Sequence, residues 1–214
     1  MFKIEKLDLL VSLYIFCILV SELMGAKTFR ILTTPFPLNA SVAIFALPLI
    51  YSINDVVIEV LGIARARSIV RSGLIVVAFV FLYSILTVSL PPSARFAPNE
   101  AAYDKIFGLS ARIAAASLIA FFISEFTDLF VFQKIRARLG KKALWFRNNA
   151  SNIIAFFLDT VIFMTLAFWA LNRPFADNVS FLWSLILPYW LLKCTMSVLV
   201  TPLVYVGVRW LKAK

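Results

Sequence analysis

The chain has 214 residues, of which 62% are hydrophobic and only 15% are charged, and it carries a formal net charge of +10. Soluble domains contain roughly 25% charged residues, so this composition and a mean hydropathy of +0.93 exclude an ordinary soluble domain. There is no histidine, and the two cysteines, Cys17 and Cys194, lie in apolar segments. This pattern argues against a metal or redox site and predicts no cofactor.

Six stretches are long and apolar enough for transmembrane helices, which need about 20 mostly apolar residues. They cover approximately residues 7–26, 38–61, 70–90, 109–133, 151–171 and 181–207. The mixed charges before the first stretch favour a retained helix over a signal peptide. The sequence therefore predicts an all-α integral membrane protein, with a single polytopic membrane domain over residues 1–214 and six transmembrane helices.

The basic residues are distributed unevenly between the two sides of these predicted spans. Fourteen of the 21 Lys and Arg lie at the two termini and in the second and fourth connectors, and five lie in the other three connectors. Cytoplasmic loops carry the excess of Lys and Arg, so both termini are predicted to be cytoplasmic. The bias also explains the net charge, together with attraction to anionic lipid. Nucleic-acid binding is not expected, because the basic residues flank membrane spans and form no continuous face.

Three of the apolar stretches contain an aspartate, namely Asp55, Asp128 and Asp159. A charged side chain at the centre of a bilayer costs about 2.5–3.5 kcal/mol on insertion scales and usually marks a functional site. Residues four or seven apart share one face of a helix. The faces that result are Asp55 with Glu59, Asp128 with Ser117 and Ser124, Asp159 with Asn148, Asn152 and Phe163, and Lys193 with Tyr189 and Ser197.

A purely structural role is the alternative for each charged residue. Glu22, Lys27 and Glu59 lie near predicted helix ends, where a long side chain reaches water at little cost. Arg112 could be an anchor at the membrane interface, and Lys193 could form a structural salt bridge with Asp128 or Asp159.

Two aromatic residues lie on the Asp159 side of the fifth predicted helix. Phe156 and Phe163 are candidates for stacking on a flat ligand. Core packing is the simpler explanation for either one alone, because the chain contains 21 phenylalanines and most of them must face lipid.

Four segments, taken in order, resemble the queuosine precursor transporter family, also called vitamin-uptake-type transporters. They are LPLIYSINDVVIEVLG, ARIAAASLIAFFISEFTDLFVF, WFRNNASNIIAFFLDTVIF and YWLLKCTMSVLVTPLVY, and the similarity runs from about residue 20 to residue 206. The resemblance implies a multi-pass protein of the bacterial inner membrane that is not an enzyme. Its expected function is the import of 7-deazaguanine precursors of the modified tRNA base queuosine, by secondary or facilitative transport.

The same resemblance implies a set of substrate-binding residues. Carried over by motif they are Asp55, Arg112, Asp128, Arg147, Asn148, Ser151, Asp159 and Lys193, and the shared helix face adds Asn152. A deazapurine offers N–H donors and a carbonyl acceptor. A carboxylate can accept two parallel N–H bonds, and Asn, Lys or Arg can donate to the carbonyl.

Two other functions stay open at this point. A substrate-binding subunit of an energy-coupling-factor vitamin transporter also has about six helices, and small-residue pairs such as Ala116 and Ala120 could dock a partner helix. An intramembrane aspartyl enzyme could use Asp128 and Asp159, although no glycine flanks them. The chain has no GxxxxGK[ST] loop, so energy would come from an ion gradient, a coupling partner or metabolic trapping. The sequence leaves open whether the protein forms a homo-oligomer.

Overall fold

The computed structural model describes residues 5–33, 37–139, 144–199 and 201–212, with side chains described outside 125–152 and 196–203. The chain is mainly helical. Its helices are α1 (Lys6–Met24), α2 (Leu47–Leu61), α3 (Ile63–Ser89), α4 (Glu100–Leu139), α5 (Leu144–Phe168), α6 (Phe175–Leu199) and α7 (Thr201–Lys212). Two strands, β1 (Thr28–Leu32) and β2 (Leu38–Ser41), and two short 3-10 helices, η1 (Val42–Phe45) and η2 (Ala97–Asn99), complete the described elements.

Five helical stretches of the described residues are long and apolar enough to cross a membrane. They are Lys6–Met24, Val42–Leu61, Ile63–Ser89, Ala97–Ser124 and Phe175–Thr195, and a shorter apolar helix covers Ile153–Phe168. The apolar composition is thus arranged in long helices that expose many large hydrophobic side chains. The protein is a multi-pass membrane protein, as the composition predicts.

The helix boundaries differ from the predicted ranges at several places. The second range includes β2 and η1, so α2 begins only at Leu47, and the last range is divided between α6 and α7. The basic segment after Gly62 is helical and belongs to α3, and α4 has 40 residues. Hydropathy marks apolar sequence, whereas helices continue through polar residues that favour the helical state. Gly62 separates α2 from α3, because its φ of 83° is a left-handed conformation that glycine adopts readily.

A β-hairpin between α1 and α2 is an element that the apolar pattern does not predict. β1 and β2 pair antiparallel, with Thr28 opposite Ser41 and Arg30 opposite Asn39. β2 packs against α6. Two hydrogen bonds hold it there: Asn39 Nδ2 donates to Ser184 Oγ at 2.7 Å, and Tyr189 Oη donates to the Ser41 carbonyl at 3.0 Å.

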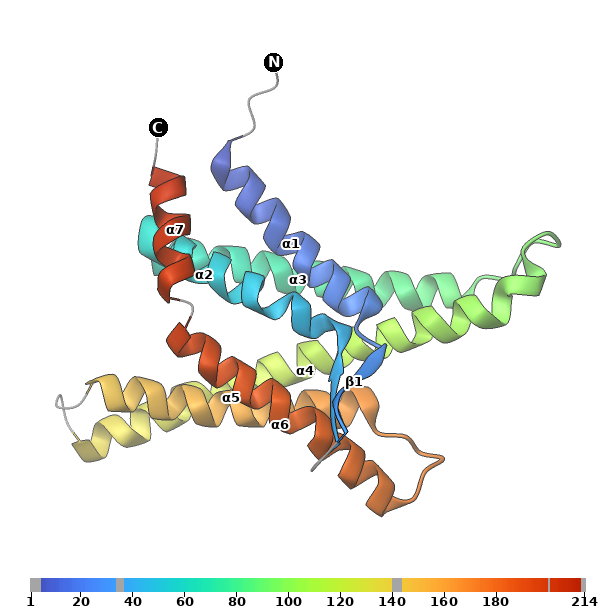
Figure 1. Ribbon diagram of the computed structural model, residues 1–214. Coiled ribbons are helices and arrows are strands. Elements are labelled where there is room, and N and C mark those ends of the chain that lie inside the picture. The colour runs from blue at the N-terminus through green and yellow to red at the C-terminus, as the bar shows by residue number, and fades with distance from the viewer. Residues whose placement is uncertain (1–4, 34–36, 140–143, 200, 213–214) are drawn as a thin grey trace.

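The helices pack into one body around a shared interior (Figure 1). α4 packs against both α3 and α5, α5 packs against α6, and α1 contacts α2, α3 and α4. The buried side chains form small clusters between neighbouring helices. One cluster joins the hairpin to α5 and α6 through Ala40, Met164 and Leu185, which are all fully buried.

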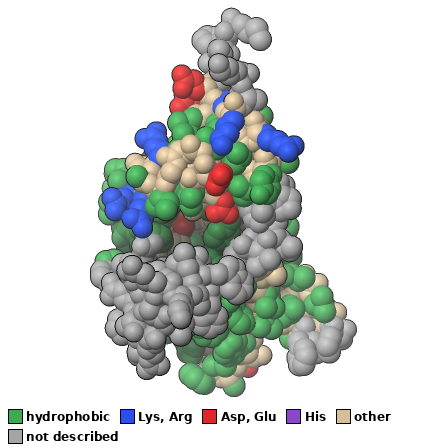
Figure 2. All heavy atoms as spheres, turned by 90° about the vertical axis from the view of Figure 1, so that its left-hand side faces the viewer, with side chains coloured by type: hydrophobic (Ala, Val, Ile, Leu, Met, Phe, Trp, Pro, Cys, Tyr) green, Lys and Arg blue, Asp and Glu red, His purple; other side chains and the backbone are tan. Residues whose placement is uncertain are grey.

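One end of the molecule gathers both ends of the described chain. The start of α1, the end of α7 and the α2–α3 junction lie on the left-hand side of Figure 1, as do the end of α4 and the start of α5. Figure 2 views this end and shows Lys and Arg side chains gathered on its upper half. The basic residues of these segments whose side chains are described are Lys6, Arg65, Arg67, Arg71, Arg209 and Lys212.

Candidate functional site

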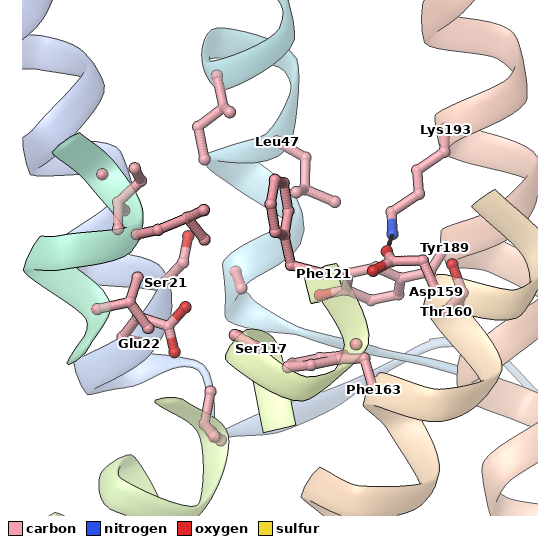
Figure 3. Close-up of a pocket in the computed structure, with 18 of the residues that line it drawn as sticks. Ser21, Glu22, Leu47, Ser117, Phe121, Asp159, Thr160, Phe163, Tyr189 and Lys193 are labelled. Atoms are coloured by element: carbon pink, nitrogen blue, oxygen red, sulfur yellow. Dashed lines mark hydrogen bonds and ion pairs between the residues drawn. The ribbon is translucent and has the colours of Figure 1, made fainter. Parts of the chain in front are cut away.

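A pocket with a volume of about 260 Å³ lies among the helices, and each of α1 to α6 contributes to its lining. This volume is close to the lower end of the roughly 300–1,000 Å³ range of small-molecule sites. Most of the lining is apolar, with a few polar side chains at two separate places. Figure 3 shows both places, with Glu22 on one side of the pocket and Asp159 on the other.

The first polar place is an ion pair between two neighbouring helices. Lys193 Nζ of α6 donates a hydrogen bond to Asp159 Oδ2 of α5, and the two side chains are 10% and 24% exposed. The low exposure means that each charge depends on the other, because an unpaired charge is costly away from water. The pair faces the pocket (Figure 3). Tyr51 and Tyr189 also line the pocket and lie near Lys193. Of the two salt-bridge partners considered for Lys193, the structure shows Asp159.

The second polar place is the carboxyl group of Glu22, near the end of α1. Glu22 is only 6% exposed. Ser117 of α4 lies close to it in the lining (Figure 3). The Oε2 atom is buried and has no hydrogen-bond partner within the described residues. The sequence places Glu22 near a helix end and so suggests contact with water, but the structure turns it into the interior.

Aromatic side chains form part of the wall between these two places. Phe121 of α4 and Phe163 of α5 line the pocket and lie between Glu22 and Asp159 in the view of Figure 3. Phe163 is also held edge-on by Phe168, with ring centroids 6.3 Å apart. Phe156, the other stacking candidate, is not among the lining residues and contacts Tyr51 edge-on at 6.2 Å.

Two of the expected substrate-binding residues lie away from this pocket. Asp55 of α2 is exposed and is not part of the lining. Arg112 donates from Nε to the Leu166 carbonyl at 2.7 Å and from Nη2 to the Trp169 carbonyl at 2.6 Å. These carbonyls belong to the last turn of α5 and to the residue that follows it, where backbone acceptors lack helical partners. Arg112 therefore clamps α4 to the end of α5.

The side chains of the remaining expected residues lie outside the described part of the structure, which gives only the helix that carries each residue. α4 carries Asp128, and α5 carries Arg147, Asn148, Ser151 and Asn152.

Sequence spacing finds some of the lining residues and misses others. The four-residue spacing on α6 places Tyr189 beside Lys193, and both line the pocket. Ser117 lies on the polar stripe of α4 and also lines it. Nothing local in the sequence distinguishes Tyr51, Phe121 or Thr160 as lining residues. Within the described residues, no three His, Cys, Asp or Glu side chains gather as a metal site would require.

Residues 41–207 match the family described as "Putative vitamin uptake transporter". A protein of Bacillus subtilis (strain 168) named "Probable queuosine precursor transporter" is 31% identical over 135 residues, which cover 62% of this chain and 58% of that protein. The "Queuosine precursor transporter" of Escherichia coli (strain K12) is 27% identical over 131 residues, covering 58% of this chain and 53% of that protein.

A third relative comes from Haemophilus influenzae (strain ATCC 51907 / DSM 11121 / KW20 / Rd) and is also named "Probable queuosine precursor transporter". It is 26% identical over 144 residues, covering 65% of this chain and 57% of that protein. The chain thus spans a little over half the length of the curated relatives it matches. No solved structure matches it. The matched range includes both members of the Asp159–Lys193 pair, and the family resemblance found in the sequence is confirmed: this chain belongs to the vitamin uptake transporter family.

Proposed function

We propose that this protein imports a queuosine precursor, a 7-deazaguanine base, across the bacterial inner membrane without chemical conversion. The observation that carries the proposal is the Asp159–Lys193 pair, which faces an otherwise mostly apolar pocket inside a helical membrane protein. The names of the relatives point to the same cargo. Transport is secondary or facilitative, since the chain contains no phosphate-binding loop.

The chemistry of the pocket suits a flat, donor-rich base. The other carboxylate oxygen of Asp159 can accept N–H groups from a purine-like ring edge, and the ammonium of Lys193 can donate to the carbonyl of the base. Phe121 and Phe163 supply apolar ring surfaces beside these groups. A few polar groups that fix orientation within an apolar pocket are the usual design of small-molecule sites.

We also propose six membrane spans in one domain, with both termini in the cytoplasm. α5, whose apolar part covers Ile153–Phe168, is the span that we add to the five long apolar helices. Support for the orientation comes from the basic side chains at the end of the molecule where α1 begins and α7 ends. An excess of Lys and Arg marks cytoplasmic segments.

The further substrate-binding positions divide into two groups within this proposal. Asp128, Arg147, Asn148, Ser151 and Asn152 stay proposed because α4 and α5, which carry them, both line the pocket. Arg112 and Asp55 lie outside the pocket, and Arg112 holds α5 in place.

Two observations weigh against the other functions. Ala116 and Ala120, the small pair suited to docking a partner helix, are each 1% exposed and so are already packed inside this chain. Asp159 is paired with a lysine, whereas an aspartyl dyad needs two carboxyl groups that share a proton.

The test uses bacteria that can neither make nor import queuosine precursors. Expression of this chain with added 7-deazaguanine precursor should restore queuosine in tRNA, measured by mass spectrometry of nucleosides. Asp159→Asn should reduce this restoration at least tenfold. The matched control is Asp177→Asn, an exposed aspartate at the start of the neighbouring helix α6, which should retain it.

Each outcome of this experiment has a distinct meaning. Failure of the unchanged chain to restore queuosine, at normal membrane levels, shows that the proposed substrate is wrong. Wild-type restoration by Asp159→Asn shows that the proposed site is wrong. Dependence of restoration on an energy-coupling-factor ATPase in the host would favour the substrate-binding subunit instead.

A further inference from the structure

Glu22 is a buried carboxyl group that the proposed base-binding pair does not use. It lines the pocket on α1, is more than nine-tenths buried, and directs an unpartnered oxygen into the interior (Figure 3). Burying an acceptor without a partner costs roughly 1–3 kcal/mol, and more when the group is charged. A group placed in this way is expected to meet its partner when the pocket is filled.

The charges around the pocket are not balanced. The described lining residues include two carboxyl groups, Glu22 and Asp159, and one cationic side chain, Lys193, which is already paired with Asp159. Ser117, the polar neighbour of Glu22 in the lining, brings no charge. A ligand with one positive charge near Glu22 would therefore complete the balance, because buried charges in proteins are paired.

The position of Glu22 indicates which part of the ligand would carry the positive charge. Figure 3 shows Glu22 across the pocket from Asp159, with Phe121 and Phe163 between them. If the ring edge of a base binds to the Asp159–Lys193 pair, a substituent on the far side of the ring extends toward Glu22. A protonated amine on that substituent can donate to the unpartnered Oε2 atom.

We propose that Glu22 is a specificity-determining residue that binds a protonated amine on the ring substituent of the imported base. This inference rests on the proposed function and goes further, since it names the substrate class: 7-deazaguanines with a cationic aminomethyl arm are preferred over those with a neutral arm.

The test compares the uptake of two radiolabelled 7-deazaguanines that differ only in the arm, one with an aminomethyl group and one with a neutral nitrile. Glu22→Gln should reduce uptake of the aminomethyl base at least tenfold and change uptake of the nitrile base less than threefold. Asp159→Asn should reduce uptake of both. The matched control is Glu59→Gln, an exposed acid on α2, which should change neither.

A second measurement uses the unchanged protein and so does not depend on whether a variant folds. The aminomethyl base should inhibit uptake of the labelled nitrile base at least ten times more strongly than its neutral hydroxymethyl analogue, which has nearly the same shape. Equal inhibition by the two analogues overturns the inference.

The remaining outcomes separate the inference from the function on which it rests. Uptake of the nitrile base but not of the aminomethyl base by the unchanged protein overturns the inference alone. An equal loss of aminomethyl-base and nitrile-base uptake in a folded Glu22→Gln protein also overturns the inference alone, because it points to a role of Glu22 in proton coupling or in structure. Uptake of neither base overturns the proposed function and the inference together.

Discussion

Asp159 and Lys193 show how much a single charged residue can depend on its partner. Removing one member of a buried pair leaves an uncompensated charge and costs roughly 3–5 kcal/mol, whereas replacing both members is often neutral. We therefore expect Asp159→Asn and Lys193→Met to lower the midpoint of thermal unfolding in detergent, and the double variant to recover it. A thiol-reactive dye can follow unfolding in a protein without the half-buried Cys194, because Cys17 is only 2% exposed.

Uptake separates a binding role of this pair from a structural one. The double variant should regain stability but should not transport the base, because it lacks both the acceptor and the ammonium donor. A double variant that transports normally would show that the pair only holds α5 and α6 together.

At the residue scale, the sequence predicts which types of residue line the pocket better than it predicts which residues interact with one another. An aspartate and a lysine inside apolar stretches are visible at once, and both line the pocket. The position of Glu22 is not visible, because its neighbour Ser117 lies on α4, which is far from α1 in the chain. Arg112 is misleading for the same reason, since its partners are backbone carbonyls on another helix.

At the scale of helices, Arg112 is predicted to stabilise the α4–α5 contact without binding substrate. Its two hydrogen bonds go to carbonyls at the end of α5, and a hydrogen bond to a charged group contributes about 1.5 kcal/mol or more. Arg112→Gln should therefore lower the thermal midpoint and leave the KM for uptake unchanged. Arg95→Gln, in an exposed connector, is the control and should change neither. A raised KM with unchanged stability would instead support the substrate-binding role that the family resemblance implies.

The contact between α1 and α3 depends on the absence of a side chain at Gly73. A Cβ atom there would lie 2.6 Å from Ile18 Cδ1 and 3.2 Å from Tyr14 Cε1, whereas nothing lies within 4 Å of the equivalent position at Gly108. The end of the Ile18 side chain can shift for a single carbon, but a valine adds two more carbons beside the Tyr14 ring, and such overpacking costs about 1–3 kcal/mol. Gly73→Val should thus lower the thermal midpoint measurably more than Gly108→Val. Similar effects of the two changes would show that α1 and α3 can separate without loss.

Helices were predictable as elements because their apolar runs are long, but the hairpin was not. The strands TFRIL and LNAS are only five and four residues long and lie beside apolar helices. Their position is determined by contacts with α6, such as Asn39 with Ser184. Contacts of this kind join residues that are distant in sequence and leave no local pattern.

At the scale of the whole molecule, the arrangement of the ends predicts which residues face each side of the membrane. In a variant without its native cysteines, Arg173→Cys should react with a membrane-impermeant maleimide in right-side-out spheroplasts, and Arg67→Cys should react only after permeabilisation. Both positions are exposed, and they lie in the α5–α6 connector and at the start of α3. Labelling with the reverse pattern would invert the proposed orientation.

Charge bias and apolar length therefore predict a membrane protein and favour one orientation. They do not predict the shape of the interior. The pocket needs side chains from six helices at once, and no property of one segment specifies how six segments meet. The residues at the contacts between these helices include alanines and glycines, whose small size allows the helices to approach one another closely.

The hairpin also lies at the depth of the proposed spans. β1 presents an exposed strand edge at Arg30 to Leu32, and backbone groups at such an edge must find water or protein because hydrocarbon offers them no partner. Tyr189 touches the hairpin, and it lies about 21 Å along α6 from Phe175 at 1.5 Å per residue. The hairpin therefore reaches into the span Phe175–Thr195, where its open edge must meet water or protein. Lys193 lies one helical turn further along α6, about 6 Å away, so water that follows the hairpin would give a ligand from that side a short path to the ion pair.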